Sequence, residues 1–113
     1  MQVNIKKVKI FVTIPSENVE IVRDAVCKAG AGVIGNYSFC TFASNGTGTF
    51  IPNDAANPHI GTNGITERVE EAKLEFICQI SNVKQVLKEL RKAHPYEEPA
   101  IDIVPLIDEE NFI

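Results

Sequence analysis

The sequence predicts an α+β fold, a ferredoxin-like sandwich with the order βαββαβ and a long connection between its second and third strands. Four β-prone segments and two segments with helical apolar spacing, in this order along the chain, indicate that fold. The 113 residues, 44% hydrophobic and 23% charged, suit one globular domain. We expect the domain to span residues 1–106 and an acidic tail to follow at 107–113.

The charge balance excludes several classes of partner. Eleven Lys and Arg residues against fifteen Asp and Glu residues give a net charge of −4, so no basic face is expected for nucleic acid. No apolar run approaches the ~20 residues that cross a bilayer, and no targeting segment is recognised. We therefore expect a cytoplasmic protein without membrane contact.

Three widely spaced cysteines argue against a disulfide framework and against a zinc ribbon.

The first strand and the first helix are read from their apolar spacing. The strand is expected over Lys6–Ile14, and Pro15 ends it. Ser16 is placed to accept hydrogen bonds from the first turn of a helix that ends at Gly30. The inward positions are expected to be Val8, Ile10, Val12 and Ile14 in the strand, and Val19, Val22, Val26 and Ala29 in the helix.

Gly30–Gly35 fits the letters G-x-G-x-x-G of a dinucleotide-binding turn. That turn works when its glycines leave a strand and open a helix, whereas here they leave a helix and lead to a strand. We interpret them as a helix end and a tight connection.

The second strand is expected over the aromatic segment Asn36–Ala43, and the third over Glu71–Ile80, where apolar and charged residues alternate. Between them, Ser44–Ile65 is rich in Gly and Asn, with turn signals at Asn45-Gly46 and Asn63-Gly64. So long a connection is uncommon unless it binds something or packs against a neighbour.

A second helix and a short edge strand complete the fold. Ser81 or Asn82 is expected to cap the helix, and His94 ends it because Pro95 follows. The last strand, Ile101–Leu106, is bordered by prolines, as is typical of a sheet edge. The apolar stripe of the helix comprises Val83, Val86, Leu87, Leu90 and Ala93.

Each helix has only one apolar stripe, so both are expected on the same face of an antiparallel sheet. The other face, which bears Phe11, would be wet or covered by another subunit. We favour oligomerisation.

The sharpest local motif is His94-Pro95-Tyr96-Glu97-Glu98-Pro99. Two prolines fix the backbone around an imidazole, a phenol and two carboxylates, which lowers the entropy lost on gripping a ligand. His94, Glu97 and Glu98 are candidate ligands of Zn²⁺ or Cu²⁺, and Tyr96 is a candidate ligand contact. The alternative is a plain chain turn, with His94 capping the helix and the glutamates solvated.

Other candidate site residues lie elsewhere in the chain. Glu71 and Glu75 share one strand face and could bind a ligand, or form a solvated row. Tyr37 and Cys40 are candidate ligand contacts in the aromatic segment, although Cys40 could simply be buried. His59, in the long connection, is a candidate metal ligand or a solvated side chain. No nucleophile motif is present, and Cys27 and Cys78 are expected in the core.

Several spaced motifs carry a family resemblance that covers about residues 8–106. Together they resemble the YqfO-type domain, which occurs alone or inserted in proteins of the NGG-interacting-factor-three family. The motifs are Lys9-Ile-Phe-Val-Thr-Ile-Pro15, Gly30-Ala-Gly-Val-Ile-Gly-Asn-Tyr-Ser-Phe-Cys40, Gly46-Thr-Gly-Thr-Phe-Ile-Pro52, Asn57-Pro-His-Ile-Gly61, Glu67-x-Val-Glu-Glu71 and His94-Pro-Tyr-Glu-Glu-Pro99.

The segment His94–Pro99 also resembles the matching stretch of CutA proteins, which are trimeric and linked to divalent-cation tolerance. The resemblance implies the CutA/PII-like fold and favours a homotrimer. In the long members of the family, the flanking domains hold a pair of metal ions, so that site and any hydrolase activity attached to it are not implied for this segment.

We therefore expect a non-enzymatic, oligomeric binding or regulatory module, in which the connection Ser44–Ile65 and the turn His94–Pro99 form a subunit-interface site. The expected ligand is a divalent metal ion or a small metabolite. One alternative is a metal-assisted hydrolase that uses His94 with Glu71, Glu75 or Glu98. The other is a protein-interaction domain that docks a partner on the uncovered sheet face.

Overall fold

A computed structural model describes residues 2–113 and contains one antiparallel sheet with the strand order β2-β3-β1-β4. The two central strands have the clearest apolar alternation in the sequence. The elements are β1 (Lys7–Pro15), the 3₁₀ turn η1 (Ser16–Asn18), α1 (Val19–Lys28), β2 (Phe42–Phe50), β3 (Glu67–Gln79), α2 (Ile80–Ala93), β4 (Ile101–Leu106) and the 3₁₀ turn η2 (Glu109–Phe112).

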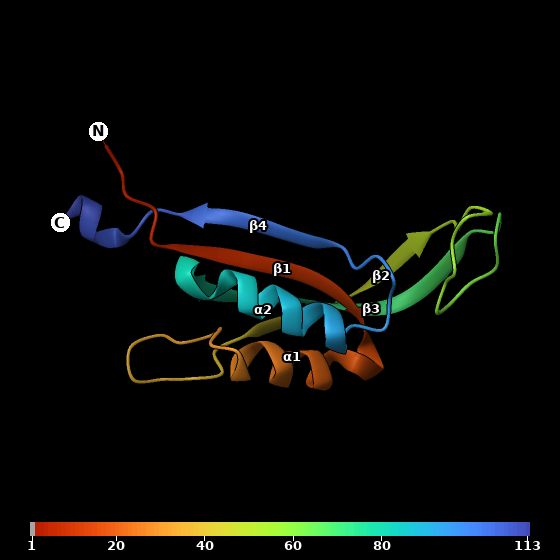
Figure 1. Ribbon diagram of the computed structural model, residues 1–113, viewed down its shortest axis with the longest axis horizontal. Coiled ribbons are helices and arrows are strands. Elements are labelled where there is room, and N and C mark those ends of the chain that lie inside the picture. The colour runs from red at the N-terminus through yellow and green to blue at the C-terminus, as the bar shows by residue number, and fades with distance from the viewer. Residues whose placement is uncertain (1) are drawn as a thin grey trace.

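Both helices lie on the same face of the sheet, as Figure 1 shows. Their stripes pack on the inward residues of β1 and β3, so the predicted two-layer α+β arrangement is confirmed. Burying these side chains supplies most of the apolar stabilisation of the fold. The fully buried side chains include Ile10, Val12, Ile14, Leu74, Phe76, Val22, Val26, Val86 and Leu90.

Strand pairing places the remaining side chains on the face of the sheet that carries no helices, which we call the open face. β1 pairs with β3 so that Phe11 lies opposite Glu75 and Thr13 lies opposite Lys73. β4 pairs with the other edge of β1 as far as Val12, and its position at the sheet edge accommodates the backbone of Pro105. Beyond Val12, no strand of residues 2–113 pairs with this edge of β1.

The second strand was predicted in the wrong place. The segment 36–43 is mainly an irregular loop, and β2 begins at Phe42 and runs through the residues expected to form a turn at Asn45-Gly46. Phe39 has a φ of 57°, which no strand accommodates, and Ile34 and Tyr37 pair only with each other. Pairing with the early part of β3 keeps the glycine-rich segment extended, so the connection between these strands shortens to residues 51–66.

The predicted end of the first helix is confirmed, whereas the predicted caps are wrong. Gly30, with a φ of +114°, donates its N–H to the carbonyl of Cys27 at 3.1 Å as the chain leaves α1. Ser16 lies in η1 instead of capping α1 with its side chain. Helix α2 begins at Ile80, before Ser81 and Asn82, and its N-cap is Gln79 without a side-chain hydrogen bond.

The molecule is elongated, with principal extents of 52 × 29 × 24 Å. Both termini and the loop after α1 lie at one end, and the connection between β2 and β3 lies at the other (Figure 1). Among residues 2–113, no helix has the length and apolar character needed to span a bilayer.

Candidate ligand-binding site

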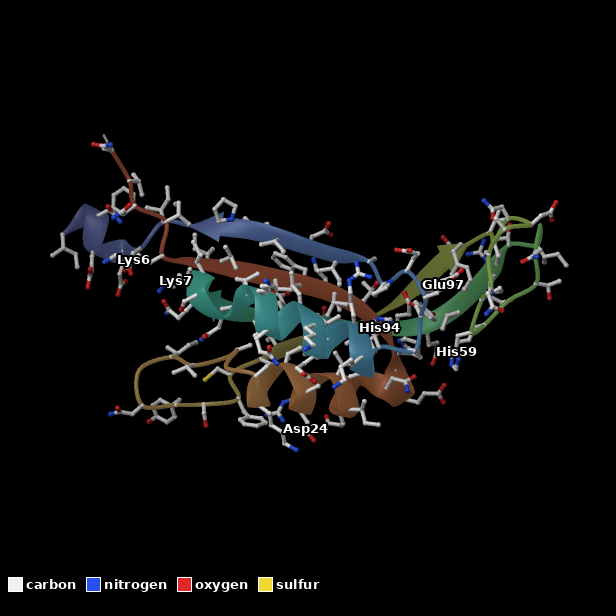
Figure 2. All side chains as sticks on the ribbon, in the orientation of Figure 1. Lys6, Lys7, Asp24, His59, His94 and Glu97 are labelled. Carbon is white, nitrogen blue, oxygen red and sulfur yellow. The ribbon has the colours of Figure 1, made fainter. Side chains whose placement is uncertain are left out.

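A cavity of about 950 Å³ lies at the end of the sheet where β2 and β3 extend beyond β4. Strand β2, the connection after it and the turn after α2 form its walls. The labelled side chains of His59 and Glu97 lie in this part of the molecule in Figure 2. The connection and the turn that the sequence singled out are therefore brought together. The lining includes Thr13, Gly48, Phe50, His59, Glu71, Lys73, Tyr96, Glu97 and Glu98.

His94 anchors the turn that leads into the cavity. Its ring Nε2 lies 2.8 Å from the carbonyl oxygen of Thr13, just past the last residue of β1 that pairs with β4. The backbone N–H of Tyr96 donates to His94 Nδ1 at 3.1 Å. Because Nδ1 accepts, the proton of the neutral ring sits on Nε2 and is donated to Thr13. The ring therefore fixes the turn against the unpaired edge of β1.

The surroundings of His94 favour its neutral form. The residue is buried, and burial lowers the pKa of its imidazole. The Thr13 carbonyl and the nearby Glu71 carboxylate oppose that effect without outweighing it. Both ring nitrogens are already engaged with backbone groups, so the arrangement does not present His94 as a metal ligand.

Tyr96 connects this anchor to the floor of the cavity. Its hydroxyl donates to Glu71 Oε2 at 2.8 Å, and its ring meets Phe50 edge-on with centroids 5.8 Å apart. Burial, the hydrogen bond to Glu71 and the charges of Glu71 and Glu67 all raise the pKa of Tyr96. The phenol thus stays protonated and acts as a donor.

Glu71 is an acidic side chain with only 7% of its surface exposed. It lies on β3 and pairs with Gly46 of β2. Gly48 follows two residues later on the same face of β2. A Cβ atom at Gly48 would collide with Glu71 Oε1, so the missing side chain makes room for the carboxylate. A turn was predicted at Asn45-Gly46, and the role of Gly48 beside Glu71 was not predicted. The spacing Gly46-Thr-Gly48-Thr, which alternates with period two, is the signal that could have indicated a strand.

Glu97 joins the two walls of the cavity. Its Oε1 accepts a hydrogen bond from the backbone N–H of Asn57 at 2.9 Å, which ties the connection to the turn. Glu98 and His59 line the same cavity. Five of the predicted site residues therefore gather here: Glu71, Tyr96, Glu97, Glu98 and His59.

Four predicted site residues lie outside this group. Tyr37 and Cys40 belong to the loop after α1, at the opposite end of the molecule (Figure 1), and Tyr37 is 76% exposed. Glu75 pairs with Lys9 at 3.6 Å in the middle of the open face. His94 supports the cavity through Tyr96 without lining it. The sequence could not separate these sites, because strand register and loop placement decide which side chains meet.

The residues predicted to bind a metal do not form a ligand set in the described part of the chain. Within residues 2–113, no three His, Cys, Asp or Glu side chains lie close enough together to hold a metal ion. Glu97 already accepts a hydrogen bond from the backbone of Asn57. Both ring nitrogens of His94 are already hydrogen-bonded to the backbone of Thr13 and Tyr96.

No family model matches the chain. It is 50% identical over 101 residues to a GTP cyclohydrolase 1 type 2 homolog of Halalkalibacterium halodurans, an alignment that covers 89% of this chain and 27% of the relative. It is 48% identical over 98 residues to the Bacillus subtilis protein of the same description, covering 87% and 26%. The chain thus spans about a quarter of the length of these relatives.

Solved structures show the same fold. A Bacillus cereus protein related to NIF3 superposes with a TM-score of 0.80 at 45% identity, covering 92% of this chain and 26% of that one. The divalent cation tolerance protein CutA from Archaeoglobus fulgidus superposes with a TM-score of 0.64 at 19% identity, covering 88% and 83%. The second likeness extends over most of both chains, so the fold recurs as a separate protein.

Proposed function

Because this chain is a small CutA-like domain, homologous to a segment of NIF3-related proteins, we propose that it is an oligomeric module that binds a small polar molecule. The binding site in this proposal is the cavity between β2, the connection 51–66 and the turn after α2. The activity suggested by the description of the long relatives is not part of the proposal, since this chain matches about a quarter of them.

The cavity is the observation that carries the proposal. Its volume of about 950 Å³ lies within the range typical of small-molecule sites. Its walls combine aromatic rings, strand backbone and a few polar side chains, which is the usual composition of a ligand site. The hydrogen bonds made by His94 and by Glu97 fix the turn and the connection, so the walls are largely preformed.

The open sheet face supports the oligomeric part of the proposal. Phe42 is 65% exposed and Val104 is 44% exposed, and both lie on the face without helices. Apolar side chains in that position are commonly covered by another protein surface. The cavity opens on the same face of the sheet, so a neighbouring subunit would also help to close it.

A ligand screen against the intact chain tests the proposal. We expect members of a panel of amines, amino acids, carboxylates and nucleotides to raise the melting temperature, with Zn²⁺ and Cu²⁺ tested separately. Two-dimensional NMR should place the shifted amides along β2 and at residues 94–98. If no compound changes either signal, or if the shifts fall at the loop after α1, the cavity is not the binding site.

A further inference from the structure

We propose that the cavity recognises an organic cation, a primary ammonium or guanidinium group, which pairs with the carboxylate of Glu71. This inference rests on the proposed function and names the chemistry of its ligand. It is drawn from the charge balance of Glu71, from the surfaces beside it and from the size of the cavity.

Within residues 2–113, the negative charge of Glu71 has no cationic partner. Although the side chain is 93% buried, no Lys, Arg or His nitrogen of residues 2–113 lies within 4 Å of its oxygens. Among the described residues, the only group that donates a hydrogen bond to this carboxylate is the neutral hydroxyl of Tyr96, which donates to Oε2. A buried carboxylate without a compensating charge is costly, and a bound cation would remove that cost.

The second oxygen of Glu71 is available to such a cation. Oε1 accepts no hydrogen bond from the described residues. Every fully buried side-chain oxygen or nitrogen among these residues does have a hydrogen-bond partner. Oε1 therefore reaches solvent, and Glu71 lines the cavity. A side chain at position 48 would collide with this oxygen, so the glycine at that position leaves Oε1 its place at the cavity wall.

The surfaces near the carboxylate also suit a cation. Tyr96 and Phe50 line the cavity in edge-to-face contact, and aromatic faces attract ammonium and guanidinium groups. Glu97 and Glu98 add two further carboxylates to the lining, against the single ammonium group of Lys73. An anionic group would meet these carboxylates instead, at an energetic cost.

The nearest alternative counterion and the nearest alternative ligand fit less well. Lys73 lies two residues from Glu71 on the same strand face, but its Nζ sits 4.7 Å from the ring centroid of Phe11 and forms no ion pair with Glu71. A metal ion would require at least three ligands, and within residues 2–113 no three His, Cys, Asp or Glu side chains lie close enough together to supply them. A molecule with a cationic end and several more atoms matches both the carboxylate and the volume.

Calorimetric titration of the intact protein at pH 7 tests the inference with three probes of similar length. These are agmatine, which carries a guanidinium and an ammonium group, neutral 1,4-butanediol, and glutarate. We expect agmatine to bind at least about tenfold more tightly than either of the others, because a hydrogen bond to a charged group contributes more than one to a neutral group.

The paired variants Glu71→Gln and Glu75→Gln assign the effect to one carboxylate. Both remove one negative charge from the same face of β3, but only Glu71 lines the cavity. We expect Glu71→Gln to weaken agmatine binding by about tenfold or more and Glu75→Gln to change it by less than about twofold. Circular dichroism establishes that both variants are folded.

The outcomes separate this inference from the proposed function. Stronger binding of glutarate or butanediol than of agmatine, or equal loss in both variants, overturns the cation inference while leaving the cavity as a ligand site. Failure of every compound in the screen overturns the proposed function itself. If Glu71→Gln does not fold, Gly48→Ser, which crowds Oε1 at that carboxylate, replaces it and must weaken agmatine binding for the inference to stand.

Discussion

At the scale of single residues, His94 shows how one buried side chain can organise a turn. Its ring satisfies a carbonyl of β1 and accepts the N–H of Tyr96, so two backbone segments depend on its neutral form. The motif His94–Pro99 was predicted as a ligand cluster. In the structure its members divide between supporting the cavity and lining it.

Replacing His94 with Ala should lower the free energy of unfolding by about 1–3 kcal/mol at pH 8, because the Thr13 carbonyl loses its donor. The advantage of the wild type depends on pH. The pKa of His94 is lowered in the folded protein, so the unfolded chain binds the proton more tightly. The stability that His94 contributes is therefore complete above its ordinary pKa of about 6.5 and is lost as pH falls below it.

Urea denaturation at pH 8 and at pH 5.5 measures this difference. The gap between the wild type and His94→Ala should narrow at the lower pH. An equal gap at both values would show that the ring contributes only packing. His59→Ala serves as the control, because His59 lies in the connection and is not buried.

Glu71→Gln should raise the stability of the ligand-free protein, by about 1 kcal/mol, because the amide fills the same space without an uncompensated charge. Its matched control, Glu75→Gln, breaks the ion pair with Lys9 and should change stability by about 0–1 kcal/mol in the opposite direction. Thermal denaturation of both variants without added ligand decides this. Greater loss of stability in Glu71→Gln than in Glu75→Gln would show that the carboxylate is a structural group.

At the scale of the elements, the sequence predicts best where one face of a strand or helix is buried. The alternation in β1 and β3 and the stripes of α1 and α2 are dictated by contact with the core, so periodicity found them. Strand β2 has mostly exposed side chains, and its extended form comes from pairing with β3 instead of from its own residues. Local turn signals at Asn45-Gly46 were therefore overridden by tertiary contacts.

The cavity was predicted in part for the same reason. The sequence indicated that the connection and the turn 94–99 act together, and it included Glu71 and Tyr96 among its candidates. It could not predict that Gly48 accommodates Glu71, because that contact depends on the register between β2 and β3. It also could not place Tyr37 and Cys40 away from the cavity, since both depend on the path of a loop.

Two glycines of β2 test this account of the strand. Gly48→Val should lower the free energy of unfolding by about 1–3 kcal/mol, because its side chain collides with the carboxylate of Glu71. Gly46→Val should be neutral or stabilising, since open space surrounds its position and a β-branched residue favours an extended backbone. Chemical denaturation compares the two variants. An equal loss of stability in both variants would support the predicted turn at Asn45-Gly46 and contradict the observed strand.

At the scale of the whole molecule, the helices cover one face of the sheet and leave the other to solvent or to another chain (Figure 1). Two exposed apolar residues of that face lie on its outer strands, Phe42 on β2 opposite Glu75 and Val104 on β4 opposite Lys9, so they flank the ion pair of Lys9 and Glu75. Such a mixed surface suits contact between copies of one chain, where a charged row of both signs can pair with itself.

Light scattering on the purified chain tests the proposed assembly. We expect a closed homo-oligomer, with a trimer favoured by the resemblance to CutA proteins. Phe42→Lys should shift the mass toward the monomer, because it places a charge in the apolar part of the contact. Ile21→Lys is the matched control, since Ile21 is 61% exposed on α1, away from the open face, and this change should leave the mass unaltered. A wild-type monomer at high protein concentration, or equal dissociation in both variants, would mean that the open face is not the subunit contact.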